Sequence, residues 1–449
     1  MRMRQLRTSW MLATLATLAS LPFALTGCGS SATTGGEDSG PPPGTDAGQR
    51  PHTDAGSGVG ADTGTHSADT GARDAGHDVA VVHGRDAAPP PPGCGNGVLD
   101  GDEQCDDGNV VDLDGCDSQC HYEMVTRMTS ISIASTAGPA FCVHPGNALG
   151  TKAITSLALG QLNPPLQTDV TNGTVNVFTQ FLSLSDLKGA SATGFQIGVL
   201  DGKLDPAKGT WPSAGNPIDW WFLADPTTVN DGVPTGLLSS GVLAGGTLTA
   251  GPSTVNVDLT LGGSAAALTM RDAKIAASIP ASPAPDVPAP PPMKLAAGIT
   301  VFQTITATGA DQGLCGDITV QSLAQIPVPS ALTTGTAKCS ENYTYCGASM
   351  PVSATCNSLL DVIVGGCKVL GAITAVAATQ PDVPPSSGGA VVPLTVGASG
   401  KVTVPAADED EAYSAFLQFA ANRAHFTGES CTSATQCQTG QACTASVCK

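Results

Sequence analysis

The 449-residue sequence has little charge, few aromatic side chains and few basic residues. Charged residues make up 13% of it and aromatic residues 4%, whereas an ordinary soluble domain has about 25% charged residues. Lys and Arg number 19 against 38 Asp and Glu, which gives a net charge of −19. Phosphate contacts need clustered Lys and Arg, so this balance argues against a nucleic-acid partner.

The signatures of common enzyme classes are also missing. The chain has no Gly-x-Ser-x-Gly elbow, His-Glu-x-x-His helix, Walker loop or Rossmann fingerprint. After Ala140 it has only two histidines, His144 and His425. A Ser-His-Asp enzyme built on His144 remains an alternative to a structural histidine. No catalytic residue is assigned, and we expect a protein that is not an enzyme.

A polysaccharide hydrolase with unidentified acidic catalytic residues is the second interpretation. Glycosidases use a pair of carboxylates at a defined separation, which a sequence does not reveal. Each candidate is equally compatible with a turn. The candidates are Asp186, Asp201, Asp205, Asp219 and Asp225.

Residues 1–28 have the pattern of an export signal. Three arginines precede the apolar run Trp10–Ala24, which is short for a membrane span. The following Leu25–Cys28 resembles a bacterial lipobox, which implies a lipid on Cys28 and an anchor in the outer membrane. The anchored chain would face either the cell surface or the periplasm. An ordinary secretory signal with an incidental cysteine is the alternative.

Residues 29–93 repeat small Asp-Ala-Gly and Asp-Thr-Gly units between two proline runs. Such a segment cannot bury enough apolar surface to offset chain entropy. We therefore predict a disordered stalk.

The cysteines fall into groups that suit an oxidising compartment. The chain has 15 cysteines, and lipidation of Cys28 would leave an even number. The pairing within each group stays open. The predicted disulfide cysteines are Cys94, Cys105, Cys116 and Cys120; Cys142, Cys315, Cys339, Cys346, Cys356 and Cys367; and Cys431, Cys437, Cys443 and Cys448.

The segment Cys94–Cys120 has four cysteines and eight carboxylates but no Lys, Arg or His. Its Cys-Gly-Asn-Gly start, Glu-Gln-Cys-Asp-Asp-Gly-Asn centre and Asp-Gly-Cys end resemble the cysteine-rich repeat of myxobacterial secreted lipoproteins. Asp102 and Leu113 replace glycines of that pattern. At the C-terminus, the spacing from Cys431 to Cys448 resembles short Dickkopf-like repeats. Neither resemblance implies catalysis.

Oxygen-rich side chains in the middle of this segment are suited to calcium, which takes six to eight oxygen ligands. The same side chains equally suit turns in which Asp and Asn accept hydrogen bonds from the backbone. Both interpretations are open, and no cofactor is certain. The possible calcium ligands are Asp106, Asp107, Asn109, Asp112 and Asp114.

The large middle region alternates apolar and polar residues between Gly, Pro, Asn and Asp turns, a pattern typical of antiparallel strands. We predict a mainly β fold, an antiparallel β-sandwich with a jelly roll as one possible form. The proline-rich residues 281–292 would divide two sandwiches, unless Cys142 bonds to Cys315 across them. The clearest alternating runs are residues 174–184, 195–200, 254–261, 300–306 and 391–404.

Two segments of the C-terminal part allow a helix. Residues 406–427 place Tyr413, Phe416, Leu417 and Ala420 at helical spacing, with Arg423 and His425 near the end. They predict one helix packed on the sandwich. Residues 357–365 fit either a buried helix or a strand.

Three of the four tryptophans, Trp211, Trp220 and Trp221, lie close together in the sequence. Exposed, they would form a platform for sugar rings; buried, they would belong to the core. The organisation that we expect is a signal peptide (1–28), a stalk (29–93), an acidic cysteine-rich module (94–122), a β-sandwich region with a C-terminal helix (123–428) and a second cysteine-rich module (429–449). The predicted function is structural, adhesive or glycan-binding work at the cell surface. The partners would be the membrane, through the anchor, and an extracellular polysaccharide or another surface protein.

Overall fold

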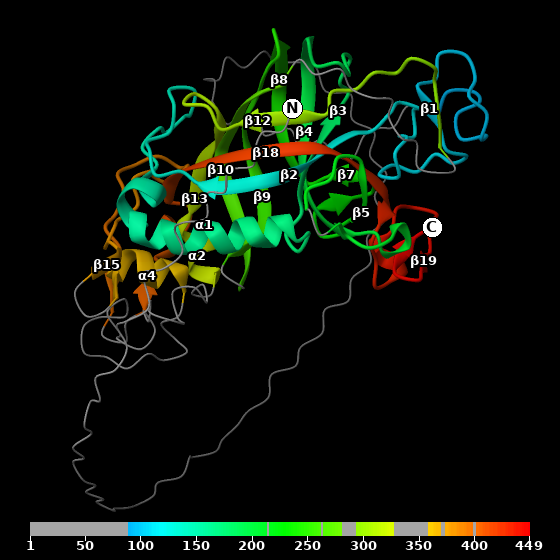
Figure 1. Ribbon diagram of the computed structural model, residues 1–449. Coiled ribbons are helices and arrows are strands. Elements are labelled where there is room, and N and C mark those ends of the chain that lie inside the picture. The colour runs from blue at the N-terminus through cyan, green and yellow to red at the C-terminus, as the bar shows by residue number, and fades with distance from the viewer. Residues whose placement is uncertain are drawn as a thin grey trace, which may run out of the picture. The chain divides into compact units, whose positions relative to one another are not determined.

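Figure 1 shows the computed structural model of the chain. It describes residues 89–212, 215–261, 264–280, 293–326, 358–369, 373–397 and 401–449, which all belong to one compact unit. The predicted signal peptide with Cys28, the stalk up to residue 88, and Cys339, Cys346 and Cys356 lie outside the described residues, as does the side chain of Cys367. Within these ranges no helix is long and apolar enough to cross a membrane.

The described chain is mainly antiparallel β, as predicted, and ten of its strands form one sheet. Most of the alternating runs of the sequence lie in these strands. The run at 391–404 instead forms two strands of two residues each outside the sheet. The ten strands are β2 (Met124–Ile133), β3 (Val177–Leu182), β4 (Ser191–Leu204), β5 (Trp220–Ala224), β8 (Gly236–Ala244), β9 (Thr247–Leu261), β10 (Ser264–Ser278), β12 (Thr304–Ala307), β13 (Gly313–Thr319) and β18 (Ala412–Glu429).

The sheet closes on itself. Its hydrogen-bonded order runs β10-β13-β18-β2-β3-β4-β8-β9, and β9 pairs back with β10 along most of both strands. The predicted antiparallel fold is thus one continuous sheet. Its one parallel pair among the described strands is that of β5 with β18.

The proline-rich residues 281–292 do not separate two domains. Strands before and after them pair within the same sheet, as β10 does with β13. A disulfide also joins Cys142 to Cys315. Two sandwiches were expected only if this bond did not form. The strands on both sides therefore share one fold.

The prediction of one helix at 406–427 is wrong. Only Ala406–Asp408 form a 3₁₀ turn, and the residues from Ala412 onward form β18, which crosses the middle of the sheet in Figure 1. β18 pairs with β12 and β13 on one side and with β2 on the other. Nearly all of its side chains are buried on both faces. A strand buried on both faces shows no alternation, so its Ala, Phe and Leu residues happened to match a helical period.

Three α-helices of the described residues lie beside the sheet. The ambiguous segment at 357–365 is helical as α4 (Leu359–Gly365), where Ser358 and Asp361 form a capping box. α2 (Val320–Gln325) is capped at its N-terminus by Thr319, whose hydroxyl accepts from the Ser322 amide. The longest helix, α1 (Ser156–Thr171), was not predicted, because Pro164 and Pro165 lie inside it and proline usually interrupts helices.

The remaining elements are short and connect or flank the sheet. They are β1 (Cys105–Asp106), β6 (Val229–Asn230), β7 (Val233–Pro234), β11 (Lys294–Leu295), β14 (Cys367–Val369), β15 (Ile373–Val376), β16 (Thr395–Val396), β17 (Val402–Thr403), β19 (Cys443–Thr444), β20 (Val447–Cys448), the π-helical turn Leu149–Ala153 and the 3₁₀ turns Pro206–Lys208, Ala406–Asp408 and Ala434–Gln436.

Five disulfides occur in the described residues, and each joins cysteines of one predicted group. Each cysteine-rich module has two of them, as small modules without a large core require. The pairs are Cys94–Cys120, Cys105–Cys116, Cys142–Cys315, Cys431–Cys443 and Cys437–Cys448.

The module at 94–122 is attached to the sheet by an apolar anchor. Leu113 is fully buried and packs in a cluster with Val125, Phe178, Phe222 and Phe426. Its φ angle is +70°, a backbone conformation that glycine adopts far more readily than other residues. The departure from the repeat pattern at Leu113 therefore places a core side chain where the pattern has glycine.

The two cysteine-rich modules also contact each other. The side-chain amide of Gln438 donates to the backbone oxygen of Asp112 at 2.8 Å and to Glu429 Oε1 at 2.9 Å. The backbone amide of Gly428 donates to the oxygen of Leu113 at 2.8 Å. The N-terminal module is thereby held by both the sheet and the chain end.

Candidate functional site

A cleft lies between the N-terminal cysteine-rich module and the sheet. Its volume is about 490 Å³, within the range typical of small-ligand sites. The module supplies one wall, and the end of β3 with the turn that follows supplies the other. The lining residues are Gln104, Asp112, Asp117, Ser118, Gln119, His121, Tyr122, Glu123, Gln180, Phe181, Leu182, Ser183, Leu184, Ser185, Leu187, Gly232 and Val233.

Glu123 is the most deeply placed carboxylate of this cleft. Its two oxygens accept from the backbone amides of Leu113 and Gly115, both at 2.8 Å, and Oε1 also accepts from Gln180 Nε2 at 3.1 Å. Burial and the neighbouring Asp112 raise the pKa of Glu123 to about 8, although the backbone donors oppose the shift. Glu123 therefore retains a proton over much of the neutral range.

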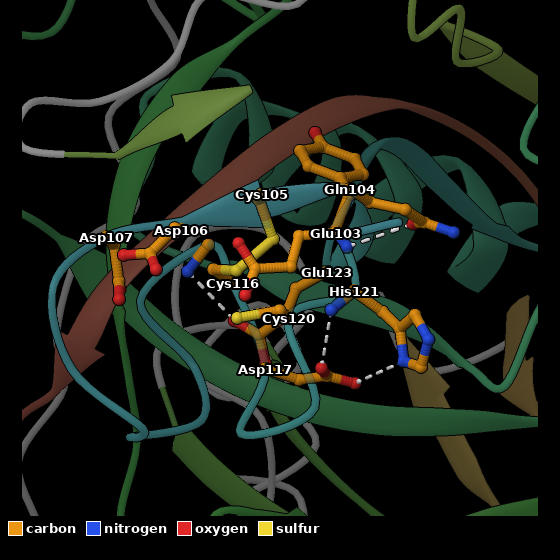
Figure 2. The surroundings of a disulfide bond; sticks show 12 residues. Glu103, Gln104, Cys105, Asp106, Asp107, Cys116, Asp117, Cys120, His121 and Glu123 are labelled. Carbon is orange, nitrogen blue, oxygen red and sulfur yellow. Dashed lines mark hydrogen bonds and ion pairs between the residues drawn. A yellow bond between two sulfur atoms is a disulfide. The ribbon is translucent and has the colours of Figure 1, made fainter. Parts of the chain in front are cut away.

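Asp117 has the opposite electrostatic environment. Burial alone would raise its pKa, but hydrogen bonds from the His121 side chain and backbone outweigh burial and lower it. The Asp117 and His121 side chains point toward each other in Figure 2, with His121 Nδ1 3.7 Å from Asp117 Oδ2. The cleft thus combines a protonated carboxyl with an ionised one.

The five candidate calcium ligands do not converge on one point. Asp106 is fully buried and accepts from the backbone amides of Gly95, Gly97 and Gly108 at 2.8–3.1 Å, as the turn interpretation expects. Asp112 faces the cleft and accepts from the Ser118 amide at 2.8 Å. The carboxylates of Asp106 and Asp112 thus accept from backbone amides, and neither residue lines the cavity that the other three share.

Asp107, Asn109 and Asp114 do come together and line a second cavity of about 290 Å³ with Asp205, Lys208, Thr427 and Lys449. Asn109 Nδ2 donates to Asp114 Oδ2 at 3.0 Å. Burial, followed by the neighbouring Asp107, raises the pKa of Asp114 to about 9. A proton or a cation would relieve the repulsion between the two carboxylates. These three side chains fit a cation with few protein ligands.

The three predicted platform tryptophans gather on and beside β5, and all are half-buried. Trp211 Nε1 donates to the Thr171 oxygen at 2.9 Å, and the Arg127 guanidinium lies 4.8 Å from the Trp211 ring centre. Trp220 and Trp221 each have a buried indole Nε1 without a hydrogen-bond partner among the described residues. The exposure of the three tryptophan side chains is thus intermediate between that of core residues and that of an open platform.

Next to these rings is a buried charged network that the sequence did not reveal. Arg423 is fully buried, and its Nε and Nη2 donate to the two Asp219 oxygens at 2.5 and 2.8 Å. His425 Nε2 lies 2.9 Å from Asp219 Oδ1, and its Nδ1 lies 3.4 Å from the Tyr122 hydroxyl. Burial opposes ionisation of Asp219, but Arg423 and His425 lower its pKa. Sequence reasoning had assigned Arg423 and His425 to the end of a helix.

Most of the candidate glycosidase acids have structural hydrogen bonds. The Asp186 side chain accepts from three backbone amides of its own turn, Asp205 binds Ala207 and Thr427, and Asp225 binds Thr227. Asp219 belongs to the buried network. Neither of the two clefts described above is lined by more than one of these acids.

His144 is paired with a carboxylate rather than with a serine. Its Nδ1 lies 2.7 Å from Asp317 Oδ2, and no serine hydroxyl among the described residues hydrogen-bonds to it. The nearby Ser414 hydroxyl donates to Asp382 at 2.7 Å. The arrangement lacks the nucleophile of a Ser-His-Asp enzyme in the part of the chain that the structure describes.

Comparison with known proteins identified no matching family model, no similar curated protein and no similar solved structure.

Proposed function

We propose that this chain is a lipid-anchored surface protein, not an enzyme, that binds a neutral saccharide in the cleft between the N-terminal module and the sheet. The observation that carries this proposal is the cleft lining, which has amides, hydroxyls and carboxylates but neither Lys nor Arg. Asp112 and Asp117 would repel an anionic ligand. A neutral ligand with many hydroxyl groups suits this surface.

The chemistry of the lining supports a sugar in particular. Sugar hydroxyls both donate and accept, and the side chains of Gln104, Gln119 and Gln180 can do the same, while Asp117 accepts. The wall formed by Phe181, Leu184 and Leu187 offers apolar contact to the C–H faces of a ring. A sugar would thus meet polar groups on one side and apolar groups on the other.

The location at the cell surface rests on the sequence. The lipobox-like Leu25–Cys28, the even cysteine groups and the resemblance of Cys94–Cys120 to a repeat of secreted lipoproteins all support export and anchoring. The saccharide would then belong to an extracellular polysaccharide or to the glycan of another surface protein.

A glycan array probed with the mature chain tests the binding site. We expect neutral glycans to be bound, and Ser185→Trp, which fills the cleft from an exposed lining position, to abolish binding. Ser387→Trp is the matched control, because Ser387 is exposed outside the cleft. Equal binding by both variants would reject this cleft. Loss of binding in Trp221→Ala but not in Ser185→Trp would move the site to the tryptophans.

Membrane fractionation tests the anchor separately. Cys28→Ser should release the mature chain from membranes, since its thiol is the predicted lipid acceptor. A variant that still pellets with membranes and resists salt extraction would show that the anchor lies elsewhere.

A second candidate function, polysaccharide hydrolysis, is favoured by one observation. Glu123 and Asp117 line the same cleft with pKa values shifted in opposite directions, which is how a general acid is separated from its partner carboxylate in glycosidases. Against this, both Glu123 oxygens already accept backbone hydrogen bonds.

Turnover distinguishes the two functions. If the chain is a hydrolase, wild type should release reducing ends from the glycan that it binds, and Asp117→Asn should bind the glycan but not cleave it. If it is only a binding protein, wild type and Asp117→Asn should both bind without cleavage.

A further inference from the structure

The Cys142–Cys315 disulfide positions a His–Asp pair above the sheet. Asp317 follows Cys315 by two residues in β13, so both side chains lie on the same face of the strand. His144 likewise follows Cys142 by two residues. The disulfide thus holds the loop with His144 over β13, and His144 Nδ1 lies 2.7 Å from Asp317 Oδ2.

A bulge in β10 brings a second carboxylate to this pair. Arg271 pairs with Asp317 and Lys274 with Cys315, so the β10 side has one extra residue. Asp272 lies in the bulge. One donor atom from each of His144, Asp272 and Asp317 lies within 4.8 Å of the other two.

The Asp317 carboxylate has an unused ligand position. Its side chain is only 1% exposed, and Oδ1 is buried without a hydrogen-bond partner among the described residues. A buried carboxylate oxygen without a partner costs free energy. Arg271 offsets part of this cost through its positive charge, but its hydrogen bonds go to Asp410 at 3.3 Å and to the Pro384 oxygen at 3.1 Å and not to Asp317 Oδ1.

We propose that His144, Asp272 and Asp317 form a binding site for a divalent transition-metal ion, with zinc as the expected ion. One imidazole nitrogen with two carboxylates suits Zn²⁺ better than Ca²⁺, which prefers oxygen alone. The His144 side chain is 38% exposed, so an ion can reach the site from solvent. Three protein ligands leave a fourth tetrahedral position open for water or a small ligand.

This site is separate from the proposed saccharide cleft and from the Asp107–Asp114 cavity. None of its three residues lines either of them. The metal proposal therefore stands or falls independently of the proposed function.

Zinc titration of the mature chain, produced without a histidine tag and first treated with chelator, tests the proposal. We expect one Zn²⁺ that His144→Ala and Asp272→Asn each bind about tenfold or more weakly, since each change removes a ligand. His121→Ala and Asp311→Asn are matched controls for these changes, at exposed positions outside the site. They should keep the wild-type affinity for Zn²⁺.

Cobalt substitution gives a readout that folding alone does not change. Co²⁺ bound to wild type should show a visible absorption band that is lost in His144→Ala and returns with a shifted maximum in His144→Asp, which keeps a ligand. Equal Zn²⁺ affinity in wild type and the His144→Ala Asp272→Asn double variant would overturn the proposal. Failure of wild type to bind Zn²⁺ would overturn it as well.

Discussion

The N-terminal cysteine-rich module and the closed sheet satisfy their buried polar groups in different ways. In the module, backbone amides donate to carboxylates instead of backbone oxygens. Asp106 accepts from three of these amides, and Glu123, the residue that follows the module, accepts from two. In the sheet, amides pair from strand to strand, and the buried charges of Arg423 and Asp219 pair with each other. A segment without regular secondary structure leaves its amides unpaired, and the acidic composition of the module supplies the missing acceptors.

The two regions also differ in what holds them together. The sheet has a large apolar core, to which the module adds three disulfide cysteines and Tyr122. The module itself is held by two disulfides and inserts Leu113 into a second, smaller apolar cluster of the sheet. Burial should dominate the stability of the sheet, and covalent links that of the module. The following changes test this division, beginning with the largest expected effect.

Breaking the buried Arg423–Asp219 ion pair should lower the free energy of unfolding the most. Arg423→Met removes the two hydrogen bonds from Arg423 to Asp219, which then keeps only His425 as a charged partner. This should cost about 3–5 kcal/mol in the free energy of unfolding. Arg271→Met is the comparison, because its pair with Asp410 is less buried: Arg271 is 13% exposed and Asp410 39% exposed. Water screens this pair more strongly, so its loss should cost less than that of Arg423. Urea unfolding of the mature chain measures both. Equal losses would mean that the buried pair contributes no more than the partly exposed pair.

Removing the anchor of the module should have the next largest effect. Leu113→Ala empties a fully buried position and should cost about 3 kcal/mol. Leu113→Gly removes one more carbon but relieves the positive φ angle, a gain of about 1–2 kcal/mol, so it should cost no more than Leu113→Ala. Val110→Ala is the control in the same module, because Val110 is 45% exposed. A cost for Leu113→Ala as small as that of Val110→Ala would contradict the anchoring role.

Two disulfides with the same loop length allow a matched test of the covalent links. Cys105–Cys116 and Cys437–Cys448 both span a sequence separation of 11. Replacing either pair by serines should cost about 2–3 kcal/mol, because both restrict the unfolded chain equally. Only loss of Cys105–Cys116 should also weaken ligand binding, since the N-terminal module forms a wall of the cleft. Equal loss of binding in both variants would show that the C-terminal module is part of the site.

The sequence predicts the structure of the cysteine-rich modules better than that of the sheet. In the modules, cysteine spacing was sufficient to group the described disulfides, because those links are local. In the sheet, β18 was mistaken for a helix, since a strand buried on both faces has lost the alternation that identifies strands.

The buried network and the metal site were beyond sequence reasoning for a different reason. Asp219 and Arg423 are 204 positions apart in the sequence, and His144 and Asp317 are 173 apart. Only the topology of the sheet and the Cys142–Cys315 disulfide bring them together. The tryptophan cluster was predicted from proximity in the chain, but its half-buried state depends on the packing of Phe222 and Arg127 against Trp211.

The smallest expected effect is that of removing calcium from the module. Only Asp107, Asn109 and Asp114 of the five candidate ligands share a cavity, so a site there should bind calcium no better than weak extracellular sites, with Kd near ~10⁻⁴–10⁻³ M. At ~1–10 mM calcium such a site adds about 1–2 kcal/mol to stability, less than either disulfide. Chelation should therefore loosen the module, whereas reduction should unfold it even in excess calcium. Proton NMR of the mature chain under chelator and then under reductant would record the two steps.

The pH dependence of calcium binding and a matched pair of variants test whether calcium binds in the Asp107–Asp114 cavity. Because burial raises the pKa of Asp114 to about 9, calcium must displace a proton there, and its affinity should increase as pH rises toward that value. Asp114→Asn should abolish the calcium-dependent stability, while Asp112→Asn, at a residue that faces the other cleft, should leave it unchanged. Collapse of the module on chelation alone would reverse the ranking, because calcium would then contribute more to its stability than the disulfides do.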